Sequence, residues 1–170
     1  TTSSAFNHGT QVLSIIAGPE AGVARGTTIE VVSFDIYPQG EESASSVALL
    51  ASAVGEAINF QLENPNTPAL ICIANGSGVP ASSTLLESRI SEAVARGIPV
   101  VVAAGNDGAS ASQYVPAAYG SMPGVICVGA IDETNNPLSS SNHGSAVDLH
   151  APGLGIGSLH PNSVGAGQTT

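Results

Sequence analysis

Apolar residues recur along this chain with two different spacings, and each spacing predicts a type of secondary structure. Steps of three and four residues predict helices, which follow residue 8 and cover residues 43–63 and 84–96. Short apolar or β-branched runs predict strands, at residues 28–37, 69–74, 99–104 and 125–130. Strands that alternate with helices of this length indicate an α/β domain with a parallel sheet. In such a domain the site lies at the carboxyl ends of the strands.

Two signals bound the last of these helices, and the pattern weakens beyond it. Thr84 followed by Glu87 is a capping-box pattern, and Gly97 is a typical helix end. From Asp132 onward the apolar pattern loosens into turns and short extended pieces, without an internal repeat. The last part of the chain therefore carries no predicted helix.

Length and charge narrow the function classes. The 170 residues fit one domain, and they carry thirteen acidic side chains against three arginines and no lysine. A net charge of −10 excludes binding to a phosphate backbone and favours cationic or neutral partners. No apolar run approaches the ~20 residues of a membrane span, and no signal peptide opens the chain. The residues alone fit either a cytoplasmic protein or a processed mature piece.

Both cysteines lie inside apolar, strand-like runs. Cys72 stands between Ile71 and Ile73, and Cys127 stands between Ile126 and Val128. Buried thiols of this kind usually pack as small apolar side chains. We therefore predict two buried, free cysteines.

His8 is the first candidate for chemistry. It precedes the apolar run of residues 12–18, and the Gly9-Thr10 pair allows a tight entry into a helix that Thr10 would cap. The positive end of a helix dipole favours the neutral form of the ring, and a neutral ring can act as a base. His8 is thus either a catalytic base or a capping histidine on the surface.

Asn106 is the second candidate, because it follows the apolar strand of residues 99–104. A strand that ends in small residues can aim an asparagine amide at a pocket, where the amide donates to a developing oxyanion. In isolation, an asparagine before Asp107-Gly108 is more often a turn residue.

Together, the two segments resemble the subtilisin-like serine peptidases, or subtilases, including the proteinase K group. His8-Gly9-Thr10 is similar to the family's catalytic histidine block, and residues 103–106 are similar to its oxyanion-hole block. The resemblance extends over nearly the whole chain, through residues 114–117, 128–130, 141–144 and 151–153. It implies one subtilisin-like domain over residues 1–170, with a three-layer α/β/α fold and a mainly parallel sheet.

The resemblance also implies roles for individual residues. His8 would be the general base and acid, and Asn106 would be the oxyanion donor. Ala74, Asn75 and Gly76 would pair with an extended peptide or protein substrate, and Ala103, Ala104 and Gly105 would border its side-chain pocket. Recognition through the backbone usually gives broad specificity. The resemblance further implies an extracellular enzyme that requires no cofactor and has neither nucleic acid nor a membrane as a partner.

The same resemblance implies a structural calcium site and separates the two cysteines. The spacing of Pro123, Val125 and Asp148 is similar to that of a calcium site in proteinase K-like members, where carbonyls and a carboxylate supply the ligands. The alternative is that Asp148 caps a turn. Cys72 and Cys127 would lie on strands with another strand between them, too far apart for a disulfide.

Two motifs of the family are absent from these residues. The aspartate motif should precede the histidine, and a Gly-Thr-Ser motif should open a late helix. The chain is therefore expected to be incomplete at both ends, with the Asp and Ser supplied by flanking segments. The alternatives are a subtilase-like pseudoenzyme that binds peptides and an unrelated α/β ligand-binding module.

Overall fold

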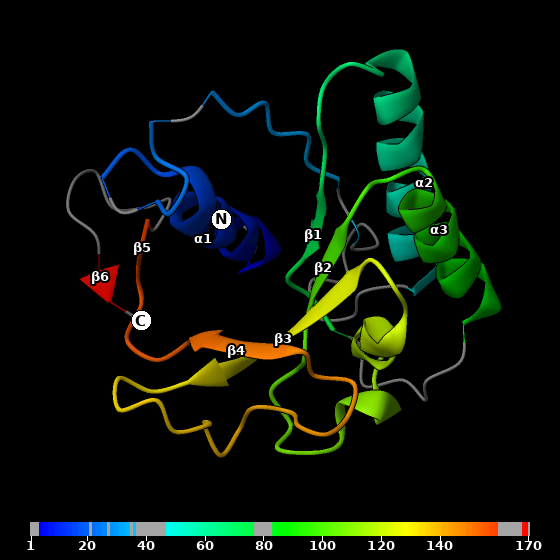
Figure 1. Ribbon diagram of the computed structural model, residues 1–170. Helices are drawn as coiled ribbons and strands as arrows, with labels where there is room; N and C mark the ends of the chain where they lie inside the picture. The colour runs from blue at the N-terminus through cyan, green and yellow to red at the C-terminus, as the bar shows by residue number, and fades with distance from the viewer. Residues whose placement is uncertain are drawn as a thin grey trace.

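A parallel four-stranded sheet is the centre of the computed structural model, which describes residues 4–20, 22–26, 28–34, 36, 47–76, 83–159 and 168–169. The strands lie in the order in which they occur along the chain: β1 (Ile71–Ile73), β2 (Val100–Ala103), β3 (Val125–Ile131) and β4 (Leu149–Pro152). All three neighbouring pairs are parallel. Their carboxyl ends therefore meet at one edge of the sheet (Figure 1).

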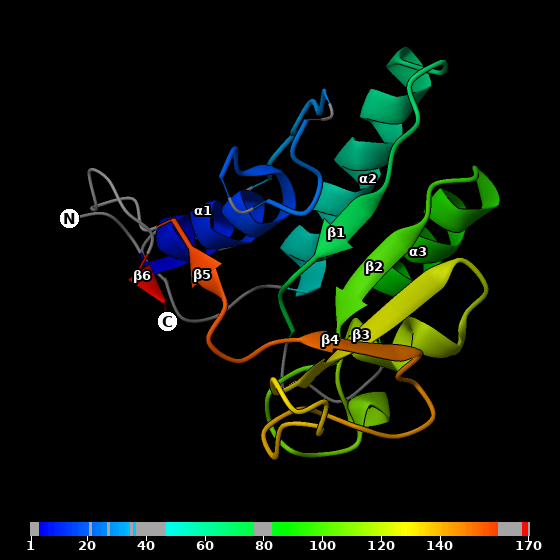
Figure 2. The ribbon, with the colours of Figure 1, turned by 60° about the vertical axis from the view of Figure 1, so that its left-hand side comes forward.

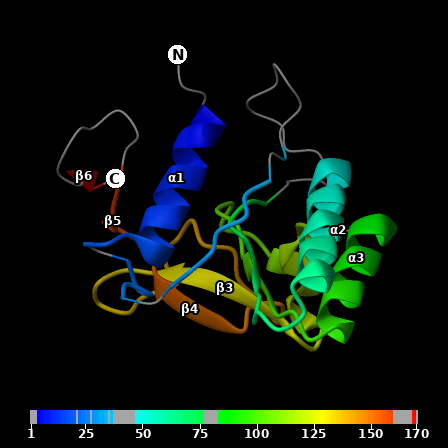
Figure 3. The same ribbon diagram turned by 90° about the horizontal axis from the view of Figure 1, so that it is seen from above.

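Helices flank this sheet on both sides, which confirms the expected three-layer α/β/α arrangement. The helices α2 (Val47–Glu63) and α3 (Thr84–Ala95) pack against each other on one face. The helix α1 (Ser4–Ala17) lies on the opposite side, as the view from above shows (Figure 3). A small antiparallel ribbon of β5 (Gly157–Ser158) and β6 (Gln168–Thr169) lies beside α1 (Figure 2). Two 3-10 turns, η1 (Ala111–Gln113) and η2 (Ala117–Ser121), precede β3 in the sequence.

The hydrophobic core fills the space between the sheet and the α2–α3 layer. Alternate strand residues belong to it, and the helices contribute their apolar stripes. The larger core side chains on α2, α3 and the strands β1 to β3 are Leu50, Val54, Ile58, Ile73, Leu86, Ile90, Val100, Val102, Val125 and Cys127. The helical and strand periodicities seen in the sequence therefore converge on one core.

On the other side α1 covers the sheet only in part, so β1 to β3 keep an open face there. Strand register aligns Cys72 with Val101 and Val101 with Ile126, in one row across β1, β2 and β3. Ile126 remains 37% exposed, and Cys72 is exposed as well. Both cysteines are free, as expected, but the prediction of a buried Cys72 is wrong. Strand alternation turns this side chain to the open face, whereas Cys127 points into the core.

The ends of α3 refine the sequence prediction by one residue. Ser83, not Thr84, caps the helix, because its Oγ accepts the N–H of Leu86 at 3.3 Å. At the other end Gly97 has φ +79°, and its N–H donates to the Val94 carbonyl. The N–H of Ile98 donates to the Ala93 carbonyl, which completes a Schellman motif as the glycine predicts.

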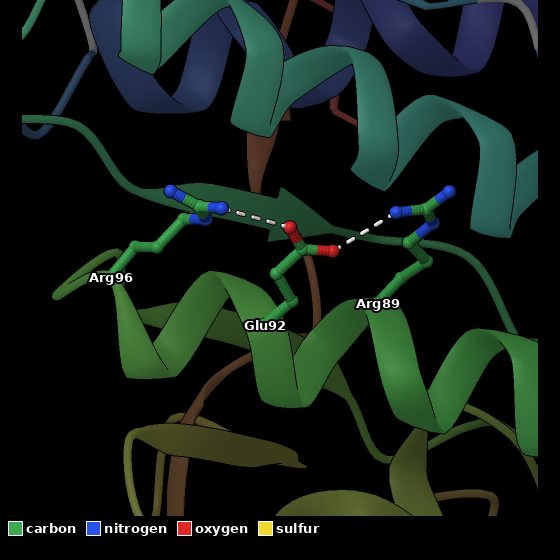
Figure 4. A network of polar contacts seen from close by, with 3 residues as sticks. All are labelled: Arg89, Glu92 and Arg96. Carbon is green, nitrogen blue, oxygen red and sulfur yellow. Dashed lines mark hydrogen bonds and ion pairs between the residues drawn. The ribbon is translucent and has the colours of Figure 1, made fainter.

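Glu92 binds two of the three arginines on an exposed flank of α3, beside α2. Its carboxylate lies 2.9 Å from Arg89 Nη1 and 3.2 Å from Arg96 Nη2 (Figure 4). Donation by Arg89 and then by Arg96 lowers the pKa of Glu92. Exposed pairs of this kind add little stability, but they place two of the few positive charges beside a carboxylate on the layer remote from α1.

Two strand predictions differ from the structure. The β-branched run at residues 28–37 has no strand among its described residues, 28–34 and 36. Its apolar side chains Ile29, Val31 and Val32 stay exposed, because composition alone does not form a strand without a pairing partner. Conversely, β4 forms in the part of the chain where the apolar pattern is weak. Residues 35, 37–46 and 77–82, which include the expected start of α2, lie outside the described residues.

Candidate active site

His8 lies within α1 and contacts a segment 66 residues away. The helix begins at Ser4, so the expectation that His8 precedes the helix and Thr10 caps it is wrong. No proline or glycine separates Ser4 from His8, so nothing in the sequence stops the helix from starting earlier. The exposed ring places Nε2 3.0 Å from the carbonyl oxygen of Ala74, directly after β1.

This contact determines which nitrogen of the imidazole ring carries the hydrogen. A backbone carbonyl only accepts hydrogen bonds, so Nε2 carries a hydrogen when it binds Ala74. In the neutral ring, Nδ1 then holds the lone pair. Before Nε2 can act as a general base, the ring must give up this hydrogen bond and change tautomer, so that Nδ1 carries the hydrogen and Nε2 holds the lone pair.

Asn106 lies at the same edge of the sheet, three residues after β2. Its side chain is exposed and forms no hydrogen bond with the described residues. The register pairs Ile73 of β1 with Val102 of β2, so the chain continues side by side into Ala74–Gly76 and residues 103–105. The predicted substrate segments therefore leave neighbouring parallel strands at one edge, together with the histidine contact and the free amide.

The loop that carries Asn106 is held by Asn142, a residue for which the sequence analysis predicts no individual role. Asn142 is fully buried, and its Oδ1 accepts the N–H groups of Asp107 at 2.9 Å and Ala109 at 3.1 Å. Its Nδ2 donates to the Ala104 carbonyl at 2.9 Å and to Asp107 Oδ2 at 3.2 Å. The backbone N–H of Asn142 donates to the Gly105 carbonyl at 2.9 Å. Every peptide unit next to Asn106 is thus bonded to one side chain or its backbone.

Gly105 is the residue that makes room for this contact. Its φ is +104°, and a Cβ at this position would lie 2.3 Å from Asn142 Nδ2. A side chain would therefore strain the backbone and displace the buried amide. The small residues that end β2 in the sequence have a packing reason as well as the role predicted for them.

A hollow of about 270 Å³ opens between α1 and the segment from β4 to β5. Its lining residues are His8, Gln11, Val12, Ile15, Pro152, Gly153, Ile156 and Ser158. On its α1 wall, His8 is the sole titratable side chain. The histidine ring therefore lies between a mostly apolar hollow and the sheet edge.

Asp148 lies against Cys127 of β3, the strand that begins with Val125 of the expected calcium site. Its Oδ2 accepts the Cys127 N–H at 2.7 Å, and its own N–H donates to the Cys127 carbonyl at 3.0 Å. Burial, and then the Asp148 carboxylate, raise the pKa of Cys127 to about 11. This thiol therefore remains protonated at neutral pH and is a poor nucleophile.

One of the two carbonyls expected at the calcium site, that of Val125, faces the side of β3 on which Asp148 lies. Carbonyls alternate in direction along a strand, so the Val125 carbonyl points to the same side as that of Cys127, toward β4. Pro123 precedes Val125 in an exposed turn. The described residues contain no cluster of three His, Cys, Asp or Glu side chains, so this arrangement would bind through carbonyls and a single carboxylate.

Helices long and apolar enough to cross a bilayer do not occur in the part of the chain that the structure describes.

Comparison with known proteins identifies relatives over almost the entire chain. The model of the Subtilase family, Peptidase S8, matches residues 1–169. "Subtilisin-like protease 2" of Pseudogymnoascus destructans is 35% identical over 95% of this chain and 37% of its own length. "Extracellular serine proteinase" of Thermus sp. is 37% identical over 88% of this chain and 33% of its own, and Subtilisin BL of Lederbergia lenta is 31% identical over 95% and 56%.

A solved structure agrees with these relatives. The crystal structure of a cold adapted subtilisin-like serine proteinase superposes with a TM-score of 0.74 at 29% identity, over 90% of this chain and 51% of that one. The chain thus spans between one third and just over one half of the proteins that it matches. With the sheet, the helices and the matched residues in agreement, the chain belongs to the subtilase family of serine peptidases.

Proposed function

We propose that this chain is part of a subtilisin-type serine endopeptidase, in which it supplies the histidine base and the oxyanion donor. The observation that carries the proposal is the common position of His8 and Asn106. The His8 ring is bonded at 3.0 Å to the end of β1, and Asn106 extends from the end of the adjacent β2. Parallel α/β sheets bind their ligands at this edge.

The chemistry follows from the two side chains. His8 Nε2 removes the proton of a serine hydroxyl as its oxygen attacks the scissile carbonyl carbon. The carbonyl oxygen gains negative charge, and the Asn106 amide donates a hydrogen bond to it. His8 then gives the proton to the leaving amine, which leaves an acyl-enzyme that water hydrolyses through the same steps.

We propose an extended peptide or protein chain as the substrate. Ala74, Asn75 and Gly76 continue from β1, which is an edge strand of the described sheet, and an edge strand can add a peptide through backbone hydrogen bonds. Ala103, Ala104 and Gly105 carry small or no side chains, so they leave space for the side chain before the scissile bond. Recognition of this kind favours broad specificity.

We propose that the serine nucleophile and the aspartate of the triad come from other segments of the same protein. The support is that the chain spans only part of each relative and contains neither a Gly-Thr-Ser motif nor an aspartate motif before His8. An aspartate that accepts a hydrogen bond from Nδ1–H of His8 would favour the tautomer with its lone pair on Nε2, and this tautomer cannot donate to the Ala74 carbonyl. We further propose an extracellular location, which the name of the Thermus relative, "Extracellular serine proteinase", states for that protein.

Labelling with a fluorophosphonate tests this assignment. The 170-residue chain alone should not react, because a base and an oxyanion donor cannot form an acyl-enzyme without a nucleophile. The complete protein with its flanking segments should label at one serine and hydrolyse an extended peptide. Efficient labelling of the isolated chain would mean that its nucleophile lies within these residues. A complete protein that binds peptides but never labels would be a pseudoenzyme.

We also propose a structural calcium ion bound by the carbonyls of Pro123 and Val125 and the carboxylate of Asp148. In chelator-treated protein, saturating calcium should raise the melting temperature by about 2–4 °C for each kcal/mol of binding free energy. Asp148→Asn should lose this response, while the asparagine oxygen can still accept the Cys127 N–H. Glu133→Gln, which changes an exposed acid elsewhere, should respond as the unmodified protein does. An equal calcium response in all three proteins would exclude Asp148 as a ligand.

A further inference from the structure

We propose that Asn142 is the positioning residue of the oxyanion hole, because its buried amide fixes the direction of the Asn106 side chain. The inference rests on the proposed peptidase function and goes beyond it. Asn142 lies 36 residues after Asn106 in the sequence, and its side chain bonds to the backbone of the loop that carries Asn106. It does not touch substrate, so its influence on the reaction passes through the backbone of residues 104–109.

The hydrogen bonds of Asn142 have only one consistent arrangement. Its Oδ1 faces two backbone N–H groups, which only donate, and its Nδ2 faces a carbonyl and a carboxylate, which accept. Rotation of the amide by 180° would oppose donor to donor and acceptor to acceptor. The side chain is 0% exposed, so water cannot compensate for a lost bond. The network therefore selects one conformation of the loop.

Asn106 is held only through its neighbours. Among the described residues its side chain is unbonded, while the carbonyls of Ala104 and Gly105 and the N–H of Asp107 all bind Asn142. An oxyanion donor gains its effect from orientation before the reaction begins. Because the direction of the Asn106 Cα–Cβ bond is set by these flanking peptide units, Asn142 supplies that orientation.

Ser141 shows that the network has two separable parts. Its buried Oγ accepts the Ala130 N–H at 3.0 Å and donates to the Asn142 carbonyl at 3.1 Å. It makes no hydrogen bond to the loop of residues 104–109. Ser141 thus attaches the segment of residues 141–142 to β3. The Asn142 side chain attaches the loop of residues 104–109 to that segment.

Asn142→Asp changes this contact with almost no change in shape. The new carboxylate still accepts from Asp107 N and Ala109 N, but it cannot donate to the Ala104 carbonyl or to the Asp107 carboxylate. It also brings two like charges to within hydrogen-bond distance, which pushes the Asp107 side of the loop away. Adding Asp107→Asn removes the repulsion and supplies a new donor, so the double variant should regain most of the loop geometry.

The test measures the complete protein with a peptide substrate and with a peptide boronate, whose tetrahedral adduct imitates the transition state. A misplacement of about 1 Å in a catalytic group can lower the rate by ~10²-fold. We expect Asn142→Asp to lower kcat and boronate affinity in parallel, on the order of 10- to 100-fold, with KM nearly unchanged. The double variant Asn142→Asp with Asp107→Asn should recover at least half of the loss on a logarithmic scale.

Ser141→Ala serves as the matched control. It removes buried hydrogen bonds from the same segment, so it should lower the melting temperature while kcat and boronate affinity stay within a few-fold of the unmodified protein. The inference is overturned if Asn142→Asp folds and keeps kcat, or if KM rises while kcat holds. If Asn142→Asp does not fold, the double variant decides, because it still lacks the donor to the Ala104 carbonyl. A parallel fall of its kcat and boronate affinity with unchanged KM supports the inference, whereas a lower melting temperature with unchanged kcat would indicate a merely structural role. An unmodified protein without turnover would refute the proposed function instead.

Discussion

Substitution of His8 by alanine is expected to lower kcat/KM of the complete protein by a factor of ~10⁴ or more. A positioned general base typically contributes ~10²–10⁴, and the members of a catalytic triad act as a unit, so the loss exceeds that of one independent step. The folded structure should survive, because the ring is exposed and, among the described residues, it gives up only its hydrogen bond to Ala74. Steady-state hydrolysis and a thermal melt of the same sample separate the two effects.

Gln11→Ala is the control for this substitution. Gln11 lies one turn further along α1 and lines the same hollow as His8, but an amide cannot exchange a proton at neutral pH. Its kcat/KM should stay within a few-fold of the unmodified protein. If the His8→Ala variant retains more than about a tenth of the activity, which is far more than the loss of a general base allows, another residue acts as the base.

Gly105→Ala is expected to have the second largest effect, on stability and activity together. The backbone at φ +104° is unfavourable for alanine by roughly 1–2 kcal/mol, and the new Cβ would lie 2.3 Å from Asn142 Nδ2. Displacing a fully buried amide leaves polar groups unpaired, at about 1–3 kcal/mol for each such group. We therefore expect the free energy of unfolding to fall by about 3 kcal/mol or more, with loss of the oxyanion contribution.

Gly144→Ala separates backbone strain from the clash with Asn142. Gly144 has φ +106°, almost the same value, but the nearest atom to its Cβ would be Ser110 Oγ at 3.4 Å, an ordinary contact. Denaturant unfolding should show a smaller loss for Gly144→Ala, and peptide hydrolysis should be nearly preserved. Equal losses in the two variants would mean that the contact between Gly105 and Asn142 has no separate energetic role.

The sequence predicts the parts of this fold in which periodicity and burial coincide. The apolar runs around Cys72, Val101 and Ile126 are strands because both faces of a parallel sheet are apolar, and that pattern needs no knowledge of the partners. For the same reason it could not show that Cys72 faces an open side. β4 escaped prediction because its residues are mostly exposed, so no apolar period marks it.

The candidate site is predictable only as far as its motifs are local. His8 and Asn106 are recognisable from the few residues around them, and the family confirmed by comparison explains why these motifs occur together. The start of α1 at Ser4 could not be fixed, since no capping signal is decisive there. Asn142 lies in a segment that resembles the family, but nothing in that segment indicates its role. Its importance comes from four side-chain hydrogen bonds to residues more than thirty positions earlier, and such long-range pairing exists only in the folded chain.

The open row of Cys72, Val101 and Ile126 has a consequence for how copies of this chain behave in solution. Its apolar surface adjoins the edge strand β1, a combination that favours association between copies. The net charge of −10 opposes association by mutual repulsion, and salt shortens the range of that repulsion from ~30 Å at 0.01 M to ~8 Å at 0.15 M. We therefore expect the isolated chain to be monodisperse in dilute buffer and to self-associate as salt is added, which light scattering would detect. A chain whose scattering is independent of salt would have this face covered.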